Sequence, residues 1–490
     1  MNDKVIAERG KIIERLKSGV DVAVIGGGIT GAGVLNVLSS TNLKVALFDA
    51  NDFAFGTSSR SSKLIHGGLR YLANGQFSVV RDSVRERDFL LTFSNLVKKE
   101  DFFIPIDDNS WSRTELRLGL WIYSLFSKSI KAKWHSQDEI AEKFPALRNT
   151  PQKGGFVYSE GVVDDARLVM ENILSAEQNG AIAFNYGEVV DINFEKDVAT
   201  SIRVRDKILN LEFEVPVKMI INSTGPWVGK VLERISNKFS GISTMIKQIK
   251  LSKGTHIIVR KDIFPVNVAL AIRSPVDKRQ VFVIPRGDVV IIGTTEDFYN
   301  GDISNPEPTE NEIKYLIESV KNYVKGISAK DIINSYAGLR PLFGSSKNLG
   351  KISREYKVVT TGNIINILGG KITTYRTVAL KVSRIVSDHF KIKLLPNIKL
   401  TYSPDRTESK ELCKAFSDDP EKAKFCREIL FEHAYHIDDI LWRREGAFIF
   451  SADSGVSLVD KCLEVMRLTL GYSTEELGIE RERYMKLLQR

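Results

Sequence analysis

Residues 22–33 read VAVIGGGITGAG and place Gly26, Gly28 and Gly31 at G-x-G-x-x-G spacing directly after an apolar run. The first glycine permits a tight turn, the second lets the backbone approach a pyrophosphate, and the third lets a helix pack closely on its strand. A second apolar run ends at Asp49, which can accept hydrogen bonds from an adenosine ribose. This order of strand, turn, helix, strand and acid predicts a Rossmann-like dinucleotide-binding domain.

The size and composition of the chain limit the classes of protein that fit. With 490 residues it exceeds what one hydrophobic core usually serves, so two or three domains are expected. Cys413, Cys426 and Cys462 have neither disulfide-framework nor metal-ligand spacing, which fits a reducing cytoplasm and no bound metal. No apolar run reaches the roughly 18 residues of a spanning helix, and no signal core precedes the first strand.

The net charge of +9 favours anionic partners, which are a phosphate substrate, an acidic membrane surface or nucleic acid. The basic residues are spread along the chain without a concentrated tract or a nucleic-acid motif. Nucleic acid is therefore not an expected partner.

Three later segments favour FAD over NAD. A hydroxyl-rich loop after the second strand suits an extended FAD, and a Thr-Gly element at Gly225 looks like a return to its adenine side. A glycine pair before a helix start would aim N–H groups at the flavin pyrimidine edge, where negative charge accumulates on reduction. The residues expected to bind FAD are Gly26, Gly28, Gly31, Asp49, Thr57, Ser58, Ser59, Ser62, Lys63, Leu64, Gly225, Gly370, Lys371 and Thr373.

A family resemblance rests on seven ordered motifs. They are KLIHGGLRYL (63–72), VDDARLV (163–169), NSTGPWV (222–228), KGTHIIV (253–259), VFVIPRGDVVIIGTTE (281–296), GLRPL (338–342) and GGKITTYR (369–376). Together they resemble the FAD-dependent, membrane-associated, quinone-linked glycerol-3-phosphate dehydrogenases, and DILWRR (439–444) resembles the helical C-terminal domain of that family. The resemblance implies oxidation of sn-glycerol 3-phosphate to dihydroxyacetone phosphate, with electrons passing through FAD to a quinone. The alternative, an oxidase that uses oxygen and produces hydrogen peroxide, is excluded by no motif.

The reaction so implied needs a grip on the phosphate, for which arginine is preferred. The residues matching the family's substrate pocket are Arg70, Arg340, Arg354 and Lys371, with Tyr71 and Thr295 as further hydrogen-bonding candidates. For Tyr71 and Thr295, strand and core packing is the alternative. Arg340 beside the alcohol would also stabilise the developing alkoxide and so take part in catalysis.

The reaction also needs a base for the hydroxyl proton. Only two of the six histidines, His66 and His256, lie in the motifs. Imidazole titrates near neutrality and suits this role. His256 is favoured as the base and His66 as a group that positions flavin or substrate, with the reverse assignment open.

The expected fold class is an α/β FAD-binding domain of the Rossmann-like, two-dinucleotide-binding type, with an antiparallel β substrate domain and an α-helical C-terminal domain. The oxidoreductase body should span 1–395, with its FAD domain built from stretches near 1–100, 150–240 and 350–395 and its substrate domain mainly from 247–340. Residues 396–490 should form the C-terminal domain, with a linker bracketed by Pro396 and Pro404 and helical periodicity over 408–490. Such a helical tail is a common surface for dimerisation, here a homodimer, or for membrane docking, and the sequence does not decide between them.

Residues 113–134 (RTELRLGLWIYSLFSKSIKAKW) are the most interfacial-looking segment. Their apolar run is too short to span a bilayer but has basic flanks, so it could lie among lipid headgroups. A helix packed on the flavin domain is the alternative. We therefore expect a cytoplasmic protein, peripheral on the inner face of the cell membrane.

Overall fold

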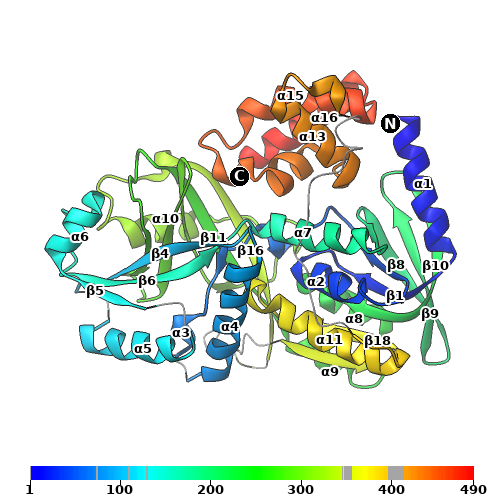
Figure 1. Ribbon diagram of the computed structural model, residues 1–490, viewed down its shortest axis with the longest axis horizontal. Coiled ribbons are helices and arrows are strands. Elements are labelled where there is room, and N and C mark those ends of the chain that lie inside the picture. Colours follow the sequence, from blue (N-terminus) through cyan, green and yellow to red (C-terminus); the bar gives the residue numbers. More distant parts are fainter. Residues whose placement is uncertain are drawn as a thin grey trace.

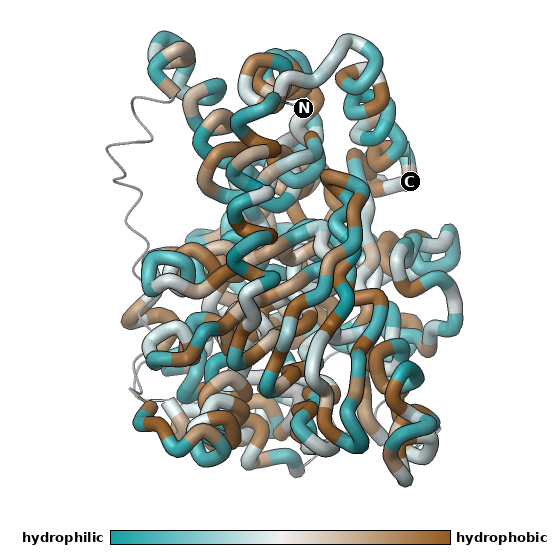
Figure 2. The backbone as a smooth tube through the Cα atoms, turned by 90° about the vertical axis from the view of Figure 1, so that its right-hand side faces the viewer, coloured by the Kyte–Doolittle hydropathy of each residue, from teal (hydrophilic) through white to brown (hydrophobic). Residues whose placement is uncertain are grey.

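The computed structural model describes residues 2–72, 75–108, 111–127, 131–344, 346, 352, 356–394 and 413–489. Two sheets lie next to each other, and the C-terminal helices cover them along one edge (Figure 1). Apolar residues run through the strands and the inner faces of the helices, with polar residues between them (Figure 2). No helix among the described residues is long and apolar enough to cross a membrane.

The first sheet contains the dinucleotide motif. Its order is β17 (Lys357–Thr361), β18 (Ile364–Leu368), β10 (Leu211–Asn222), β1 (Val20–Ile25), β2 (Val45–Phe48) and β7 (Ile182–Phe184), and the antiparallel strands β8 (Gly187–Glu195) and β9 (Val198–Asp206) extend β10. β1 pairs in parallel with both β10 and β2. Because both faces of a parallel sheet are covered, β1 is apolar and buried without alternation from Val22 to Ile25, with Asp21 near its start as the exception.

Helices cover both faces of this sheet. On one face α2 (Ile29–Leu38) packs between α7 (Asp165–Gln178) and α11 (Tyr375–Phe390). The other face is covered by α1 (Asp3–Lys17) and α8 (Val228–Ile235), with α9 (Ile242–Gln248) beside α8. The tight approach of α2 to β1 follows from the small residues of the motif.

The second sheet forms the other half of the body. Its order is β15 (Asp297–Phe298), β11 (Ile249–Arg260), β14 (Val289–Gly293), β13 (Gln280–Arg286), β12 (Ala269–Arg273), β4 (Lys98–Pro105), β6 (Gly155–Val162) and β3 (Leu64–Ile65), with β16 (Ile332–Phe343) on β11 and β5 (Lys133–His135) on β6. Its strand pairs are antiparallel apart from β12 with β4. Most strands come from 247–340, but β3 and β6 join this sheet although they lie in stretches assigned to the FAD domain.

Helices also flank the second sheet. α10 (Glu310–Val320) and α6 (Gln137–Lys143) contribute to the core on one face. On the other face lie α3 (Leu69–Leu72), α4 (Phe77–Phe93) and α5 (Arg113–Leu125), at the lower edge of the molecule in Figure 1.

The C-terminal domain lies at the opposite edge from α4 and α5 (Figure 1). Its helices are α13 (Pro420–Phe431), α14 (Ala447–Phe450), α15 (Val459–Leu470) and α16 (Thr474–Leu488), with a π-helical turn, η8 (Asp439–Arg444), between α13 and α14. Its apolar core is continuous with that of the second sheet. The expected fold class is thus confirmed: a Rossmann-like domain, a mainly antiparallel β domain and a helical C-terminal domain.

Candidate active site

A cavity of about 490 Å³ has walls from both sheets, and its size is typical of a ligand site. The predicted residues that line it are Gly26, Gly28, Asp49, Thr57, Ser58, Ser62, Leu64, His66, Gly225, His256, Arg340, Gly370, Lys371 and Thr373. The structure therefore brings together motifs that lie more than 340 residues apart in the chain.

One end of the cavity is built mainly from backbone around the glycine motif. Gly26 has φ +106°, and a Cβ there would lie 2.7 Å from the carbonyl oxygen of Ser223. A Cβ at Gly31 would lie 1.9 Å from the carbonyl oxygen of Gly26, so α2 packs on the turn only because this residue is glycine. The start of α2 faces the cavity through Gly28, and Ser58 Oγ accepts the Ile29 N–H at 2.9 Å. Open backbone at a helix N-terminus fits the pyrophosphate of a dinucleotide.

Asp49 connects this turn to the loop after β2. Its carboxylate accepts the N–H groups of Gly27 at 2.6 Å and of Asn51 at 2.9 Å. Burial raises its pKa to about 6. Asp49 also lines the cavity, where its carboxylate matches the ribose contact expected from the motif.

His256 lies at the other end, on β11. Its side chain is 1% exposed and stacks on Tyr336, with ring centroids 4.8 Å apart. Nε2 lies 2.9 Å from Ser62 Oγ, and Nδ1 has no hydrogen-bond partner among the described residues. Burial lowers its pKa well below the ordinary value, and the charge of Arg340 lowers it further. The imidazole is therefore neutral at neutral pH and able to accept a proton.

Arg340, on β16, brings a cation to the same end. Its Nη2 donates to Thr294 Oγ1 at 2.9 Å. A Cβ at Gly254, on the neighbouring strand β11, would lie 2.2 Å from Nη2, so glycine makes room for the guanidinium. Lys371 lines the same cavity at the start of the turn before α11. A guanidinium beside a neutral imidazole, in a cavity that a lysine also lines, suits a phosphorylated alcohol.

His66 joins two of the motifs. Its backbone N–H donates to Thr373 Oγ1 at 3.3 Å, and the Thr373 hydroxyl donates to the His66 carbonyl at 3.4 Å. Both residues line the cavity. The HGGLRY and GGKITTY segments therefore lie side by side in the cavity wall.

Four predicted ligands do not line the cavity: Gly31, Ser59, Lys63 and Thr295. Lys63 Nζ donates to the Ser59 carbonyl at 2.7 Å and pairs with the buried Asp165. Thr295 Oγ1 accepts the Thr255 N–H at 2.9 Å and lies 3.1 Å from Glu312 Oε1. The side chains of Lys63 and Thr295 are thus bound within the cavity wall.

Three of the predicted substrate ligands cannot be placed by side chain. The backbone of Arg70 and Tyr71 forms part of α3, beside the HGG turn, but their side chains lie outside the described structure, as does Arg354 altogether. Among the described residues, no group of three or more His, Cys, Asp or Glu side chains could hold a metal ion.

The sequence reasoning did not single out several cavity residues. No sequence motif marks three of them: Gly187 and Val189, at the start of β8, and Lys207. Arg60 lies inside the hydroxyl-rich loop and Trp227 inside the NSTGPWV motif, so both had a positional signal.

Comparison with known proteins identifies the family. The model of the FAD dependent oxidoreductase family (DAO) matches residues 21–374. The aerobic glycerol-3-phosphate dehydrogenase of Bacillus subtilis (strain 168) is 35% identical over 397 residues, which cover 78% of this chain and 70% of that protein. The corresponding protein of Staphylococcus saprophyticus is 30% identical over 533 residues, covering 96% and 93%.

Solved structures agree on the fold. The glycerol-3-phosphate dehydrogenase from Bacillus halodurans complexed with FAD superposes with a TM-score of 0.77 at 24% identity, covering 98% of this chain and 97% of that one. The L-alpha-glycerophosphate oxidase from Mycoplasma pneumoniae with FAD bound gives 0.60 at 18% identity, covering 78% and 98%. The cofactor that the cavity accommodates is thus FAD. Given the extent of the family match and identities of 30–35% over most of its length, this chain belongs to the FAD-dependent oxidoreductases and, among them, to the glycerol-3-phosphate dehydrogenase family.

Proposed function

We propose that this enzyme oxidises sn-glycerol 3-phosphate to dihydroxyacetone phosphate. The observation that carries the proposal is that His256 and the guanidinium of Arg340 lie close together in the wall of the FAD cavity, which Lys371 also lines. Its relatives in Bacillus subtilis and Staphylococcus saprophyticus are named for this substrate. When bound, FAD accepts the hydride from the substrate carbon.

In this proposal the cations hold the phosphate. The planar guanidinium of Arg340 can donate two parallel hydrogen bonds to phosphate oxygens, and Lys371 adds a second charge. Arg70 and Arg354 are proposed as further phosphate ligands on the strength of their motifs alone. Bound phosphate would also offset the charge of Arg340 beside His256, which makes it easier for the imidazole to take up a proton.

His256 is the proposed base for the substrate hydroxyl. It is neutral, lies against the cavity and has Nδ1 without a partner among the described residues. His66 is proposed to orient the flavin or the substrate, since Thr373 ties its backbone to the GGKITTY segment.

The decisive experiment is an anaerobic titration of the FAD-loaded enzyme with glycerol 3-phosphate. Loss of the oxidised flavin absorbance near 450 nm is expected at millimolar substrate (~1 mM, within the usual KM range). Glycerol, which lacks the phosphate, is the matched control and should leave the spectrum unchanged at the same concentration. A flavin that stays oxidised with glycerol 3-phosphate, while dithionite still reduces it, would contradict the proposed substrate.

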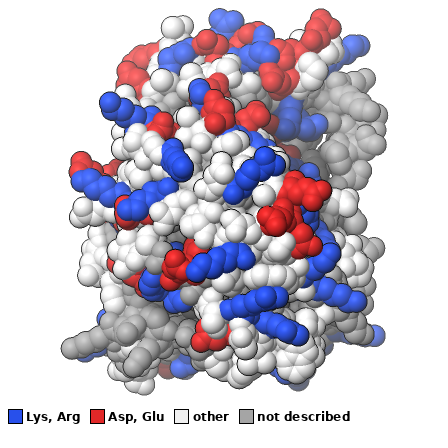
Figure 3. All heavy atoms as spheres, turned by 90° about the vertical axis from the view of Figure 1, so that its left-hand side faces the viewer, with Lys and Arg blue, Asp and Glu red and all other residues white. Residues whose placement is uncertain are grey.

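We further propose that a membrane quinone takes the electrons and that α5 touches the membrane. Leu118, Trp121 and Leu125 share one face of α5 and are 57%, 59% and 64% exposed. Phe77 and Phe93, at the two ends of the neighbouring α4, are exposed as well. On the face of the molecule that lies on the α5 side, Lys and Arg side chains are scattered among acidic and uncharged ones (Figure 3). Exposed apolar residues among basic ones suit a headgroup region.

The inner face of α5 reaches the active-site loop. Tyr123 on α5 donates to the buried Glu160 at 2.5 Å, and Glu160 accepts the N–H of Gly67, next to His66, at 3.2 Å. A Cβ at Gly67 would lie 2.0 Å from the Tyr123 hydroxyl. A membrane surface at α5 would therefore be one helix away from the loop that carries His66, as electron transfer to a quinone requires.

Membrane binding is tested with the double variant Leu118→Gln/Trp121→Gln. It should lose most sedimentation with vesicles of anionic lipid, whereas Ile479→Gln, an equally exposed apolar site on α16 at the opposite edge, should not. Equal binding by both variants would contradict the proposal. Turnover in air without quinone would favour the oxidase alternative. We also propose that the protein forms a homodimer, which sedimentation velocity tests.

A further inference from the structure

The loop after β2, residues 49–60, lies between the glycine turn and the C-terminal domain. On the side of the turn, Asp49 accepts the Gly27 N–H and the Ala54 N–H donates to the Gly27 carbonyl at 3.0 Å. On the other side, Phe53 is fully buried and meets the ring of His433 edge-on, with centroids 5.7 Å apart. One side of this short loop thus forms a wall of the FAD cavity, and the other side contacts the C-terminal helices.

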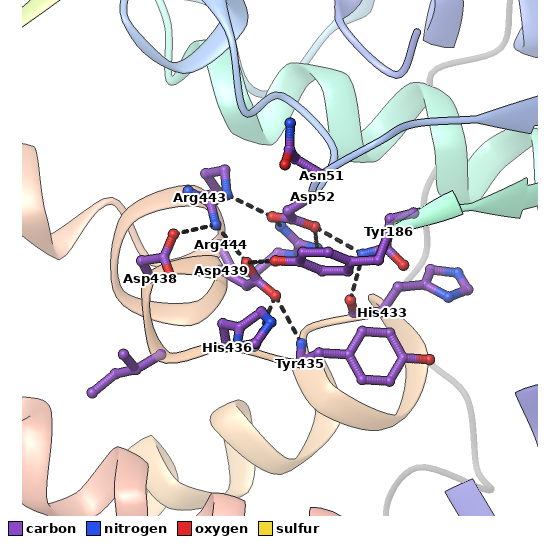
Figure 4. A network of polar contacts seen from close by, with 12 residues as sticks. Asn51, Asp52, Tyr186, His433, Tyr435, His436, Asp438, Asp439, Arg443 and Arg444 are labelled. Carbon is purple, nitrogen blue, oxygen red and sulfur yellow. Dashed lines mark hydrogen bonds and ion pairs between the residues drawn. The ribbon is translucent and has the colours of Figure 1, made fainter. Parts of the chain in front are cut away.

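Asp52 is the centre of the contact with the C-terminal domain (Figure 4). Its side chain is fully buried and accepts Arg443 Nε at 2.6 Å and both Nη atoms of Arg444 at 2.8 Å. Asn185 Nδ2 donates to it at 3.0 Å. Burial raises the pKa of Asp52, but the charges of Arg444 and Arg443 outweigh this and leave the pKa below its ordinary value.

The two arginines are held in place by further ion pairs and hydrogen bonds. Arg443 also pairs with Asp438 at 2.6 Å and with Asp439. Asp439 in turn accepts the Tyr186 hydroxyl at 2.6 Å and the Tyr435 N–H at 2.8 Å (Figure 4). Arg444 donates to the Glu432 carbonyl at 2.7 and 3.1 Å. Both guanidinium groups are therefore held in place, and Asp52 is the residue through which they act on the loop.

The same network reaches the second wall of this end of the cavity. Tyr186 precedes β8, whose first residue, Gly187, lines the cavity. The N–H of Tyr186 donates to the Asn51 carbonyl at 2.9 Å, and the N–H of Gly187 donates to the Asp49 carbonyl at 2.8 Å. Both wall segments are thus joined to each other and to the C-terminal domain.

The local structure of the C-terminal domain suits this contact. Arg443 and Arg444 end the π-helical turn η8, and π-helical turns are rare and are frequently found at functional sites. Trp442 directly precedes the two arginines. The guanidinium carbon of Arg60, a residue that lines the cavity, lies 4.9 Å from the centroid of the Trp442 ring. The FAD family model ends at residue 374, so this contact is an addition to the part of the fold that the family model describes.

We propose that the C-terminal domain forms part of the FAD site, with Arg443 and Arg444 acting through Asp52 as positioning residues that hold the 49–60 loop against the bound cofactor. This contact of Arg443 and Arg444 with Asp52, here called the Asp52 clamp, keeps FAD from dissociating and takes no part in substrate chemistry. The inference depends on FAD binding and is independent of the identity of the substrate.

The test compares the FAD affinity of apoprotein variants, measured by quenching of FAD fluorescence on reconstitution. Arg444→Gln leaves Asp52 with one charged partner and should raise the FAD dissociation constant at least tenfold. Arg444→Lys keeps the charge and should raise it two- to fivefold. At saturating FAD, both variants should keep the flavin spectrum and the KM for glycerol 3-phosphate of the wild type.

Arg167→Gln is the matched control. Arg167, on α7, pairs with the Glu432 carboxylate of the C-terminal domain at 2.6 and 3.1 Å, and neither residue lines the cavity. Arg444 donates to the backbone carbonyl of Glu432, a contact that the Arg167 variant leaves in place. This variant should lower the melting temperature but change the FAD dissociation constant less than twofold. Equal losses of FAD affinity in Arg444→Gln and Arg167→Gln would assign the clamp to general stability and overturn the proposal, as would an unchanged affinity in Arg444→Gln. If Arg444→Gln does not fold, Arg444→Lys replaces it, and an affinity equal to that of Arg167→Gln overturns the proposal.

Discussion

The two ends of the FAD cavity are built by different means. At the glycine turn the walls are mainly backbone, and Gly26, Gly28 and the start of α2 lie within a few residues of one another. At the opposite end the walls are side chains, among them His256 from β11 and Arg340 from β16, which meet only because these strands pair.

Because of this difference, changes at the glycine turn should affect the affinity for FAD, and changes at the other end should affect the oxidation of the substrate. A backbone cradle tolerates most side-chain changes elsewhere but no added atoms, since the space at Gly31 is already filled. A side-chain site depends on individual groups whose removal leaves the fold intact. Variants should therefore divide into those that lose FAD and those that keep FAD but lose turnover.

The largest expected effect is at His256. His256→Gln should slow anaerobic reduction of the flavin by glycerol 3-phosphate by about 10²–10⁴-fold, the usual contribution of a general base, with FAD still bound. His66→Gln should slow it much less, about tenfold, if positioning is its role. Stopped-flow absorbance measures both rates. The reverse ranking of the two variants would make His66 the base.

Removal of the Arg340 guanidinium should come next. Arg340→Ala should raise the KM for glycerol 3-phosphate about 100-fold, as expected for the loss of one charged partner of a buried ionic contact, while the FAD dissociation constant stays the same. Steady-state kinetics and FAD titration measure the two quantities separately. An unchanged KM would remove Arg340 from the phosphate site.

The backbone end was largely predictable from sequence, because the glycine spacing is local and each glycine has its own steric reason. The side-chain end was predictable only through motif resemblance. Lys63 shows the limit: its partner Asp165 lies 102 residues away, so nothing local indicated that its amine is used within the wall. Asp52 was missed for the same reason, since its partners Arg443 and Arg444 follow some 390 residues later.

A pair of glycine variants tests the comparison more finely. Gly31→Ala should weaken FAD binding at least tenfold because its Cβ would meet the Gly26 carbonyl oxygen. Gly254→Ala should keep FAD but raise the KM for glycerol 3-phosphate about tenfold, because its Cβ would displace the Arg340 guanidinium. FAD titration measures the FAD dissociation constant of both variants, and steady-state kinetics measures their KM for glycerol 3-phosphate. Loss of FAD affinity in Gly254→Ala would show that the two ends are not independent.

The smallest expected effect concerns the charge of His256. Burial and the charge of Arg340 hold its pKa well below 6.5, so the folded protein keeps the imidazole neutral where the unfolded chain takes up a proton. Its contribution to stability is therefore complete above pH 6.5 and is lost as the pH falls below 6.5 towards the folded pKa. Between pH 6.5 and 5.5 the wild type should lose about 1 kcal/mol more unfolding free energy than His256→Gln, in which the other titrating groups are the same. Urea unfolding of both proteins at the two pH values measures this difference. Parallel losses would mean that the imidazole titrates normally in the folded protein, and a protonated His256 could not then serve as the base at that pH.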